Sequence, residues 1–569
     1  MFEVSLPFYP AIRQWEEAGI LLHKTLTDYL ELSASVEKNS LASGVPPAYL
    51  ATRIDSALGS LHITLGQQLS QARATLSQTR NQILSHFYRL PEEVLSDIFM
   101  CVVFAPMDLS HRDPMSMKRF VLDTYHSLYN LLGVCTTWRK AALDRGSLWS
   151  IVPLFSESVS SVDLNSALKL VLGRGKRMGL SLAADLPVPA GEVTASIVAR
   201  NASRFHTAAL VTPSTSIVRS LLGILMDHNG ADSLTLSRLS IYQEREIAGI
   251  FPEAEDYVFQ SSSERASFHR LVRQLSMIQM RNVHIKWDTL TFSDQLTTLC
   301  LQEVNLGYDS GINSLLNALS SATQLRELKL VKIRTYQGSS LPQNPEALSD
   351  IWFPNLQLLL IQDVYFNTLS WFLLCIRSRT HRFSFVFTRK ALRRNFPGGE
   401  EPEDNDVDIV CELLENIPVH ALLIDVESLD ADMNVLAPWE LKRLMKVIPT
   451  LETLWMNMWE LADPYCRALH SPRKSNNSTS PSLVNLYLSC VTSLEPEAFK
   501  EIINSYCGSI RRVGLGGASA LITKDVVDWD TPIAEEELAT WLKENVQEFI
   551  KIDRNFAPPD FCQISWQMW

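Results

Sequence analysis

The chain has few of the features that would build a disulfide framework or a membrane span. Its nine cysteines are odd in number, scattered along 569 residues and never spaced as Cys-x-x-Cys. Structural disulfides and zinc are therefore not expected, and a reducing compartment, cytoplasmic or nuclear, is favoured. No run approaches the roughly 18 apolar residues of a membrane span. Residues 1–30 lack the charged and then apolar order of a secretory signal.

Motifs of catalysis and cofactor binding are also scarce. No Gly-x-Ser-x-Gly or His-Glu-x-x-His occurs, and residues 173–177 lack the spacing of a phosphate-binding loop. Cys466 and His470 are four residues apart, but two ligands alone do not make a zinc site. A net charge of −12 argues against a nucleic-acid-binding surface. We expect no enzyme activity, no metal, no cofactor, no nucleic acid and no membrane among the partners.

The composition, 46% apolar and 20% charged, is that of a folded chain, and its length predicts two or more units. Residues 1–48 are expected to be a partly helical segment followed by a linker. Residues 49–88 predict an amphipathic helix, because apolar residues recur at spacings of three and four from Ile54 to Leu76. Gly59 and Gly66 interrupt this stripe, which would make a weak coiled coil. The helix either packs on its own chain or mediates weak self-association.

Residues 89–155 contain three blocks of large apolar and aromatic side chains. Pro91 suits the first position of a helix, and the acidic residues after it suit the positive end of the helix dipole. Four apolar residues at helical spacing complete the first block, and residues 131–139 and 148–149 form the other two. A bundle this small cannot bury so many large apolar groups by itself, so we expect some of them to contact a partner.

In this order the three blocks resemble the F-box, through Leu90-Pro91-x-Glu93-Val94-Leu95, Ile98-Phe99, Val134-Cys135-x-x-Trp138-Arg139 and Leu148-Trp149. The stretch 105–129, with two prolines, departs from the family by lengthening the first connection, and reads as a loop insertion plus the start of the second helix. The resemblance implies that a Skp-type adaptor, and through it a cullin, binds here. The adaptor contacts that it implies are Leu90, Pro91, Val94, Leu95, Ile98, Phe99, Val134, Cys135, Trp138, Leu148 and Trp149.

A Leu-x-x-Leu-x-Leu unit recurs within residues 160–525. Clear copies begin at Leu296, Leu325, Leu356, Leu451, Leu483 and Ile510, and adjacent ones start 29, 31, 32 and 27 residues apart. Helical patterns lie between them, so the chain predicts an α/β solenoid of irregular leucine-rich repeats, with one parallel sheet and outer helices. Standard repeats place Asn or Cys three positions after the last strand leucine. This chain has Val304, Ile333, Val364, Trp459 and Val491 there, so an asparagine ladder is not expected.

The combination of a helix, an F-box-like block and degenerate repeats over about residues 50–520 resembles a set of proteins abundant in basidiomycete fungi. That resemblance implies a substrate-recognition subunit of a Skp-cullin-F-box type ubiquitin ligase, in which catalysis belongs to a partner enzyme. Two alternatives stay open. One is a scaffold that binds the adaptor without directing ubiquitination, and the other is an enzyme whose site is assembled from distant residues.

Side chains alternate between the two faces of a strand, so residues between the repeat leucines should face away from the core. In the later repeats this predicts a substrate-binding surface of Trp455, Asn457, Tyr487 and Arg512. Trp, Tyr and Arg are the residue types most enriched at binding hot spots. Residues 526–569 are expected to form a capping helix, over 535–550, and a tail. In the alternative reading, this helix folds over Trp455 and Tyr487 and buries them as core.

Overall fold

The computed structural model describes the chain from residue 9 to residue 561 with gaps. The described residues are 9–84, 90–104, 116–155, 164–175, 178–189, 191–227, 236–244, 251–338, 352–376, 381–398, 401–426, 434–471, 483–491, 494–506, 508–516, 521–523, 526–528, 532–553 and 556–561. They divide into two compact units, residues 1–95 and 96–569.

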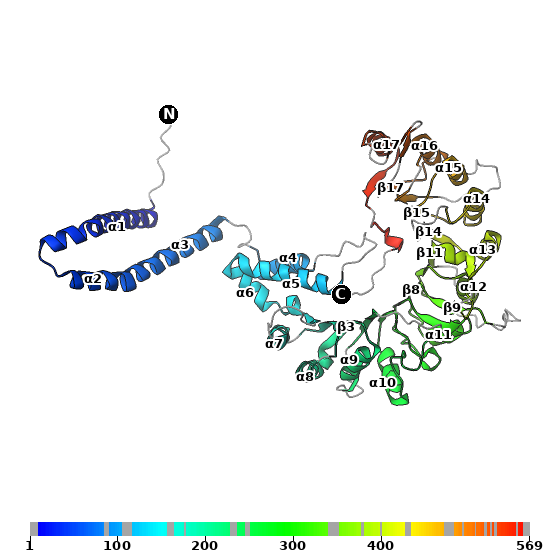
Figure 1. The fold of residues 1–569 in the computed structure, drawn as a ribbon, viewed down its shortest axis with the longest axis horizontal. Helices are drawn as coiled ribbons and strands as arrows, with labels where there is room; N and C mark the ends of the chain where they lie inside the picture. Colours follow the sequence, from blue (N-terminus) through cyan, green and yellow to red (C-terminus); the bar gives the residue numbers. More distant parts are fainter. Residues whose placement is uncertain are drawn as a thin grey trace. The chain divides into compact units, whose positions relative to one another are not determined.

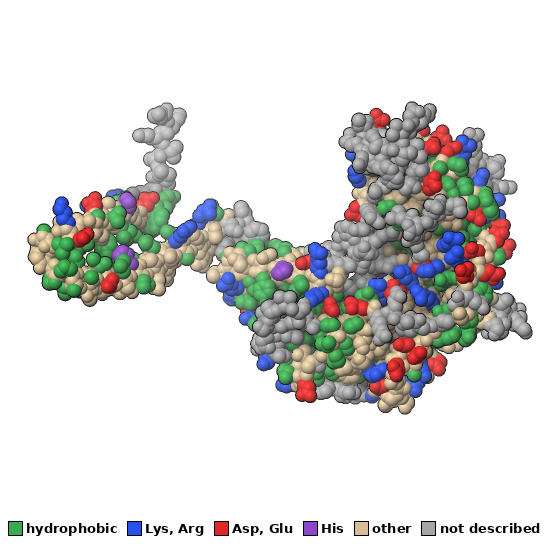
Figure 2. Space-filling view, in the orientation of Figure 1, with side chains coloured by type: hydrophobic (Ala, Val, Ile, Leu, Met, Phe, Trp, Pro, Cys, Tyr) green, Lys and Arg blue, Asp and Glu red, His purple; other side chains and the backbone are tan. Residues whose placement is uncertain are grey.

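The first unit is helical. It contains α1 (Pro10–Ala42), α2 (Pro47–Ser56), a π-helical segment η1 (Ala57–His62) and α3 (Ile63–Leu84). Tyr29 and His62 contact each other, with 3.2 Å between Tyr29 Oη and His62 Nε2. No residue described in these helices is buried, and apolar side chains line them (Figure 2). The apolar stripe predicted over 49–88 is therefore not covered by the described part of its own unit.

The second unit begins with helices. Helix α4 (Glu92–Val103) runs into it from the first unit and is followed by α5 (Met117–Val134), α6 (Thr136–Asp144) and a 3₁₀ turn, η3 (Gly146–Trp149). The Ser116 side chain caps α5 by accepting a hydrogen bond from the Arg119 N–H. Strand β1 (Ile151–Phe155) follows η3 at once. The sheet therefore starts inside the segment that the sequence assigned to the F-box-like block, 89–155.

The rest of the second unit is built on one sheet of fourteen described strands, in which every neighbouring pair is parallel. In spatial order the strands are β1, β2 (Leu180–Asp185), β3 (Phe205–Thr212), β4 (Arg238–Gln243), β5 (Met277–Arg281), β6 (Thr298–Gln302), β8 (Glu327–Val331), β10 (Leu358–Gln362), β11 (Arg382–Phe387), β14 (Val419–Asp425), β15 (Thr453–Asn457), β16 (Asn485–Ser489), β17 (Arg512–Gly516) and β20 (Glu548–Ile552). The predicted α/β solenoid is confirmed.

Helices lie on the outer side of an arc whose inner side is lined by the sheet (Figure 1). They are α7 (Leu164–Arg174), α8 (Glu192–Arg200), α9 (Thr215–Asp227), α10 (Ser262–Val272), α11 (Gly311–Leu319), α12 (Phe366–Cys375), α13 (Val407–Leu414), α14 (Pro438–Val447), α15 (Asp463–Leu469), α16 (Pro496–Ser505) and α17 (Pro532–Asn545). Short strand pairs join connecting segments: β7 (Asn305–Tyr308) with β9 (Arg334–Tyr336), β12 (Arg393–Arg394) with β13 (Glu403–Asp404), and β18 (Leu521–Thr523) with β19 (Val526–Asp528).

The core lies between the sheet and the outer helices. The motif leucines of every copy are buried there, from Leu296-x-x-Leu299-x-Leu301 to Ile510-x-x-Val513-x-Leu515. The residues that stand where an asparagine ladder would run, such as Val304 and Trp459, are buried too. Buried apolar side chains therefore occupy the positions at which an asparagine ladder would form hydrogen bonds.

A left-handed backbone conformation recurs at the carboxyl ends of several strands. The residue after the strand adopts a left-handed conformation, with φ of 51–56°, at Asn282, Glu303, Lys332, Asp363, Met458 and Cys490. Such values are uncommon for residues other than glycine. Several of these N–H groups donate to the last carbonyl of the next strand, as Glu303 N–H does to Val331 O over 2.8 Å. Where it forms, this bond holds the strand exit against the neighbouring strand.

The C-terminal region differs from the prediction. The helix expected over 535–550 ends at Asn545, and residues 548–552 form β20, which pairs with β17. Leu538, Leu542 and Val546 are buried, as an amphipathic helix requires. Phe549 and Ile550 continue the same spacing in the sequence, but the unpaired edge of β17 offers backbone hydrogen bonds that favour an extended segment. The sheet thus continues beyond residue 525, where the repeats were predicted to end.

Among the helices that the structure describes, none combines the length and the apolar character that crossing a bilayer requires.

The buried histidines make the stability of the second unit sensitive to acid. Burial, and then the nearby His420, lowers the pKa of His381 from 6.5 to about 4. The unfolded chain binds this proton more readily, so stability is fully present above about pH 6.5 and is lost as pH falls toward 4. We expect His381→Phe to reduce the loss in unfolding free energy between pH 7.5 and pH 5 by about 1–2 kcal/mol. Urea titrations at both pH values measure it, and an unchanged difference would contradict the assignment.

Candidate protein-interaction surfaces

The F-box-like block uses much of its signature as its own core. Phe99 and Trp149 are almost completely buried, and so are Leu95 and Leu148. The Phe99 ring lies 5.0 Å from that of Trp138, and Trp149 Nε1 donates a 3.0 Å hydrogen bond to the Ala142 carbonyl. Intramolecular packing covers these four residues, so the side chains at which adaptor contacts are predicted are not open to a partner in this structure.

The other predicted adaptor residues differ in exposure. Leu90, Ile98, Cys135 and Trp138 are half-buried, Pro91 is exposed, and Val94 and Val134 are 43% and 57% exposed. Cys135 has a local role, since its Sγ accepts a hydrogen bond from the Trp138 N–H at the start of α6. Val94 and Val134 are thus the large apolar side chains of the predicted set that are most open to a partner.

Sequence reasoning missed other exposed apolar side chains in this region. Val102, Leu122 and Tyr129 are each more than two-fifths exposed. Leu122 and Tyr129 fall inside the stretch 105–129, which the sequence predicts to be a loop insertion plus the start of the second helix, and α5 begins within it at Met117. The spacing of Phe120, Thr124, Leu128 and Leu131 is helical and could have marked α5. Residues 105–115 of that stretch lie outside the described residues.

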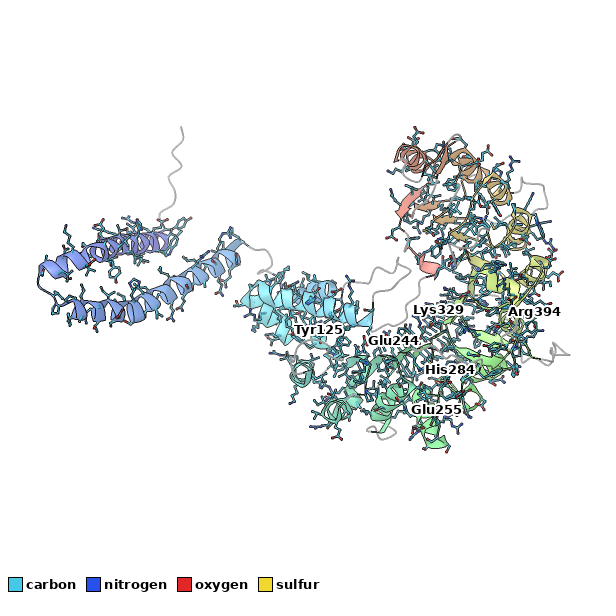
Figure 3. All side chains as sticks on the ribbon, in the orientation of Figure 1. Tyr125, Glu244, Glu255, His284, Lys329 and Arg394 are labelled. Carbon is cyan, nitrogen blue, oxygen red and sulfur yellow. The ribbon has the colours of Figure 1, made fainter. Side chains whose placement is uncertain are left out.

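Helix α5 has a second contact face, on the inner side of the sheet. Met117, Phe120 and Val121 form a cluster with Ile151 of β1, Ala183 of β2, and Ala209 and Val211 of β3. Tyr125, labelled in Figure 3, donates a hydrogen bond to the Ile151 carbonyl over 2.5 Å. Burial raises the pKa of the Tyr125 phenol far above its usual range. This helix of the F-box-like block therefore covers the inner face of the first strands and is packed against the repeat domain.

The next strands leave a polar hollow on the inner face. It is lined by Arg238, Ser276, Met277, Gln279, Thr297, Thr298, Glu327 and Lys329, from β4 to β8 and the residues just before them. Lys329 is labelled in Figure 3. Lys329 Nζ lies 3.2 Å from Glu327 Oε2. Cys300, between these residues on the same face, is buried, which raises the pKa of its thiol to about 11. The thiol is therefore protonated at neutral pH and a poor nucleophile.

The predicted substrate residues lie on the inner face, as the alternation of side chains required, but three of the four are buried. Trp455 and Tyr487 are 1% and 2% exposed, and Asn457 is buried. Arg512 is paired with Glu548, with 2.7 Å between its Nη2 and Glu548 Oε2. The cover is a short segment near residue 560, with Phe556, Ala557 and Phe561 against the two aromatic side chains. The prediction that these side chains form an exposed surface is wrong. The alternative, in which Trp455 and Tyr487 are buried, is correct, but the residues that cover them come after the predicted helix in the sequence.

No cluster of three or more potential metal ligands occurs among the described residues.

Comparisons with known proteins agree with part of this picture. Residues 87–152 match the F-box-like family. The chain is similar to a solved TLR13–ssRNA13 complex, with 12% identity over 66% of this chain and 46% of that chain, at a TM-score of 0.32. This chain therefore spans less than half of the TLR13 chain.

A solved internalin, InlF of Listeria monocytogenes, is 9% identical over 82% of this chain and 95% of that one, at a TM-score of 0.25. No curated protein matches the sequence. Both structural scores are low, so the solenoid assignment rests on the parallel sheet and its buried leucines.

Burial separates core residues of the F-box-like block from contact residues. We expect Phe99→Ala to destabilise the second unit by about 3–5 kcal/mol, because it removes a buried ring from the contact with Trp138. Val134→Ala, at an exposed position, should change stability by less than about 0.5 kcal/mol. Urea unfolding followed by tryptophan fluorescence compares the two variants, and equal effects would refute this division.

Proposed function

We propose that this chain is a substrate-recognition subunit of a Skp-cullin-F-box type ubiquitin ligase. The observation that carries the proposal is the F-box-like match at residues 87–152, continuous with a long parallel-sheet solenoid. The first element suits a protein adaptor, and the second offers an extended inner surface of the kind that repeat proteins use for binding. The resemblance to fungal F-box proteins with irregular repeats is part of the same proposal.

In this proposal the chain acts by tethering and performs no chemistry of its own. A substrate on the inner face of the sheet is held at a raised effective concentration near a partner enzyme bound through the adaptor and cullin. The packing of α5 on β1–β3 supports this role, because it fixes the F-box helix relative to the repeat strands. The chain would work in the cytoplasm or nucleus, without a metal or cofactor.

The exposed valines provide a test of adaptor binding. Val94→Asp with Val134→Asp places charge on apolar positions, and we expect it to weaken binding of a purified Skp-type adaptor at least tenfold, because burying an unpaired carboxylate is unfavourable. The control is Val193→Asp on α8, where the valine is 61% exposed. Unchanged adaptor affinity in a folded double variant would disprove the docking proposal.

The same double variant separates a ligase from a scaffold. Deleting residues 90–149 would also remove α5 from the inner face of β1–β3, so point substitutions are the cleaner choice. In cells, proteins captured by the repeat domain should become longer-lived in the double variant and not in the Val193→Asp control. Capture of adaptor and cullin without any change in protein lifetimes would favour the scaffold.

The segment 49–88 is proposed to self-associate weakly through the exposed apolar side chains of its described part, residues 49–84. Leu58 and Leu69 are 54% and 46% exposed, on the stripe that the sequence predicted. Sedimentation equilibrium of the full chain should show a concentration-dependent rise in mass that Leu58→Gln with Leu69→Gln suppresses. Leu170→Gln, at a leucine of α7 that is also 46% exposed, is the matched control. A wild-type chain that stays monomeric at every concentration would rule this association out.

A further inference from the structure

A short segment of the chain occupies the inner face of the later repeats as a ligand would. Residues 556–561, which end in the 3₁₀ turn η8 (Pro559–Phe561), lie on the inner side of the arc (Figure 1). They belong to one buried cluster with side chains of five successive strands, from Leu360 of β10 to Tyr487 of β16. We call the surface formed by Arg382, Trp455 and Tyr487, on which the segment lies, the aromatic groove.

Three side chains anchor the segment. The Phe561 ring lies 5.8 Å from the Trp455 ring, and the Phe556 ring lies 5.4 Å from the Tyr487 ring. Between them, Asp560 accepts two hydrogen bonds from Arg382, at 3.0 Å from Nε and 3.4 Å from Nη2. Paired aromatic contacts and a bidentate arginine–carboxylate contact are features of specific peptide recognition.

The backbone of the segment is bonded locally. The Phe556 N–H donates to the Asp553 carbonyl, and the Phe561 N–H donates to the Pro558 carbonyl. Pro558 and Pro559 have no N–H to offer to a strand. The segment is therefore anchored to the sheet through its side chains and does not extend the sheet as β20 does.

The groove is organised by the sheet beneath it. Trp455 Nε1 donates to Ser489 Oγ over 2.7 Å, and Ser489 Oγ donates to Asn457 Oδ1 over 2.6 Å. These bonds stay in place without the segment, so release of residues 556–561 does not orphan the polar atoms that they satisfy.

Two further features fix the groove. A Cβ at Gly514 would lie 2.5 Å from Tyr487 Cδ1, so glycine at this position leaves room for the tyrosine ring over β17. Arg382 also donates to Glu452 over 2.8 Å, so its charge keeps a partner when Asp560 leaves. The aromatic and cationic positions are thus preset, which lowers the entropy cost of binding a ligand there.

From these contacts we propose that the aromatic groove is a peptide-binding site, and that residues 556–561 are its exchangeable internal occupant. The external ligand is a protein segment with an acidic residue directly before an aromatic one and a second aromatic residue four positions before the acidic one. This deepens the proposed function, since such a segment would belong to the recognised substrate. The substrate must then displace residues 556–561 before it binds.

A labelled peptide tests the site directly. The probe is a fluorescein-labelled synthetic peptide with the sequence of residues 553–561, Asp-Arg-Asn-Phe-Ala-Pro-Pro-Asp-Phe. Full-length chain carrying Phe556→Ser and Phe561→Ser, which frees the groove, should bind this probe at least tenfold more tightly than wild type by fluorescence anisotropy. Asp560→Asn alone, a milder change, should also raise the affinity, because it weakens the hold of the internal segment on Arg382.

The specificity of the aromatic groove for the probe is measured in the chain that carries Phe556→Ser and Phe561→Ser, the double-serine chain. Adding Arg382→Gln to it, or using a probe with Asp560→Asn, should each reduce affinity about tenfold, since each removes one partner of the same charge-assisted contact. A probe with Phe561→Ser should also bind weakly.

Two results would overturn the proposal. One is failure of the probe to bind either the double-serine or the Asp560→Asn chain. The other is a collapse of cooperative unfolding in the double-serine chain, which would make residues 556–561 an integral part of the core. Neither measurement involves the adaptor. A wild-type chain that does not bind the adaptor would therefore contradict the proposed function and leave the test of the aromatic groove unaffected.

Discussion

The structure depends on the parallel ladder that runs from β1 to β20. A single repeat contributes one strand to the sheet, and it cannot bury its leucines until the next strand lies beside it. Leu328 and Leu359, for example, are neighbours in the ladder and are both buried. Cooperation between repeats therefore replaces a central globular core, and the ends and the inner face of the sheet need covers of their own.

Two parts of the chain cover the inner face of the sheet and divide it into three regions. Helix α5 closes the first strands with Met117, Phe120 and Val121, and residues 556–561 close the later ones with aromatic side chains. The polar hollow around Gln279 and Lys329 lies between the two covers. Ala209 and Trp455 are inner-face residues that the chain itself covers in this way.

Much of the repeat fold could be predicted from the sequence, because the Leu-x-x-Leu-x-Leu period carries both the strand and the direction of its side chains. The same alternation placed Trp455 and Tyr487 on the inner face. It could not show that they are covered, since the covering Phe561 comes from about a hundred residues further along the chain. Helical spacing likewise failed at Phe549 and Ile550, where an available strand edge decided the conformation. In the F-box-like block the motif located the helices, but it could not separate the buried Phe99 from the exposed Val134, because both fit an apolar pattern.

The left-handed residues at the strand exits have a consequence for how such a chain can change in length. Most of these exit residues bond to the end of the following strand, as Lys332 does to Gln362, so the turn belongs to the joint between two units. A whole unit that brings its own exit residue can be inserted or lost while both remaining joints re-form. A single residue added within a strand would instead reverse the faces of the side chains after it. The backbone geometry therefore favours changes in chain length by complete repeat units.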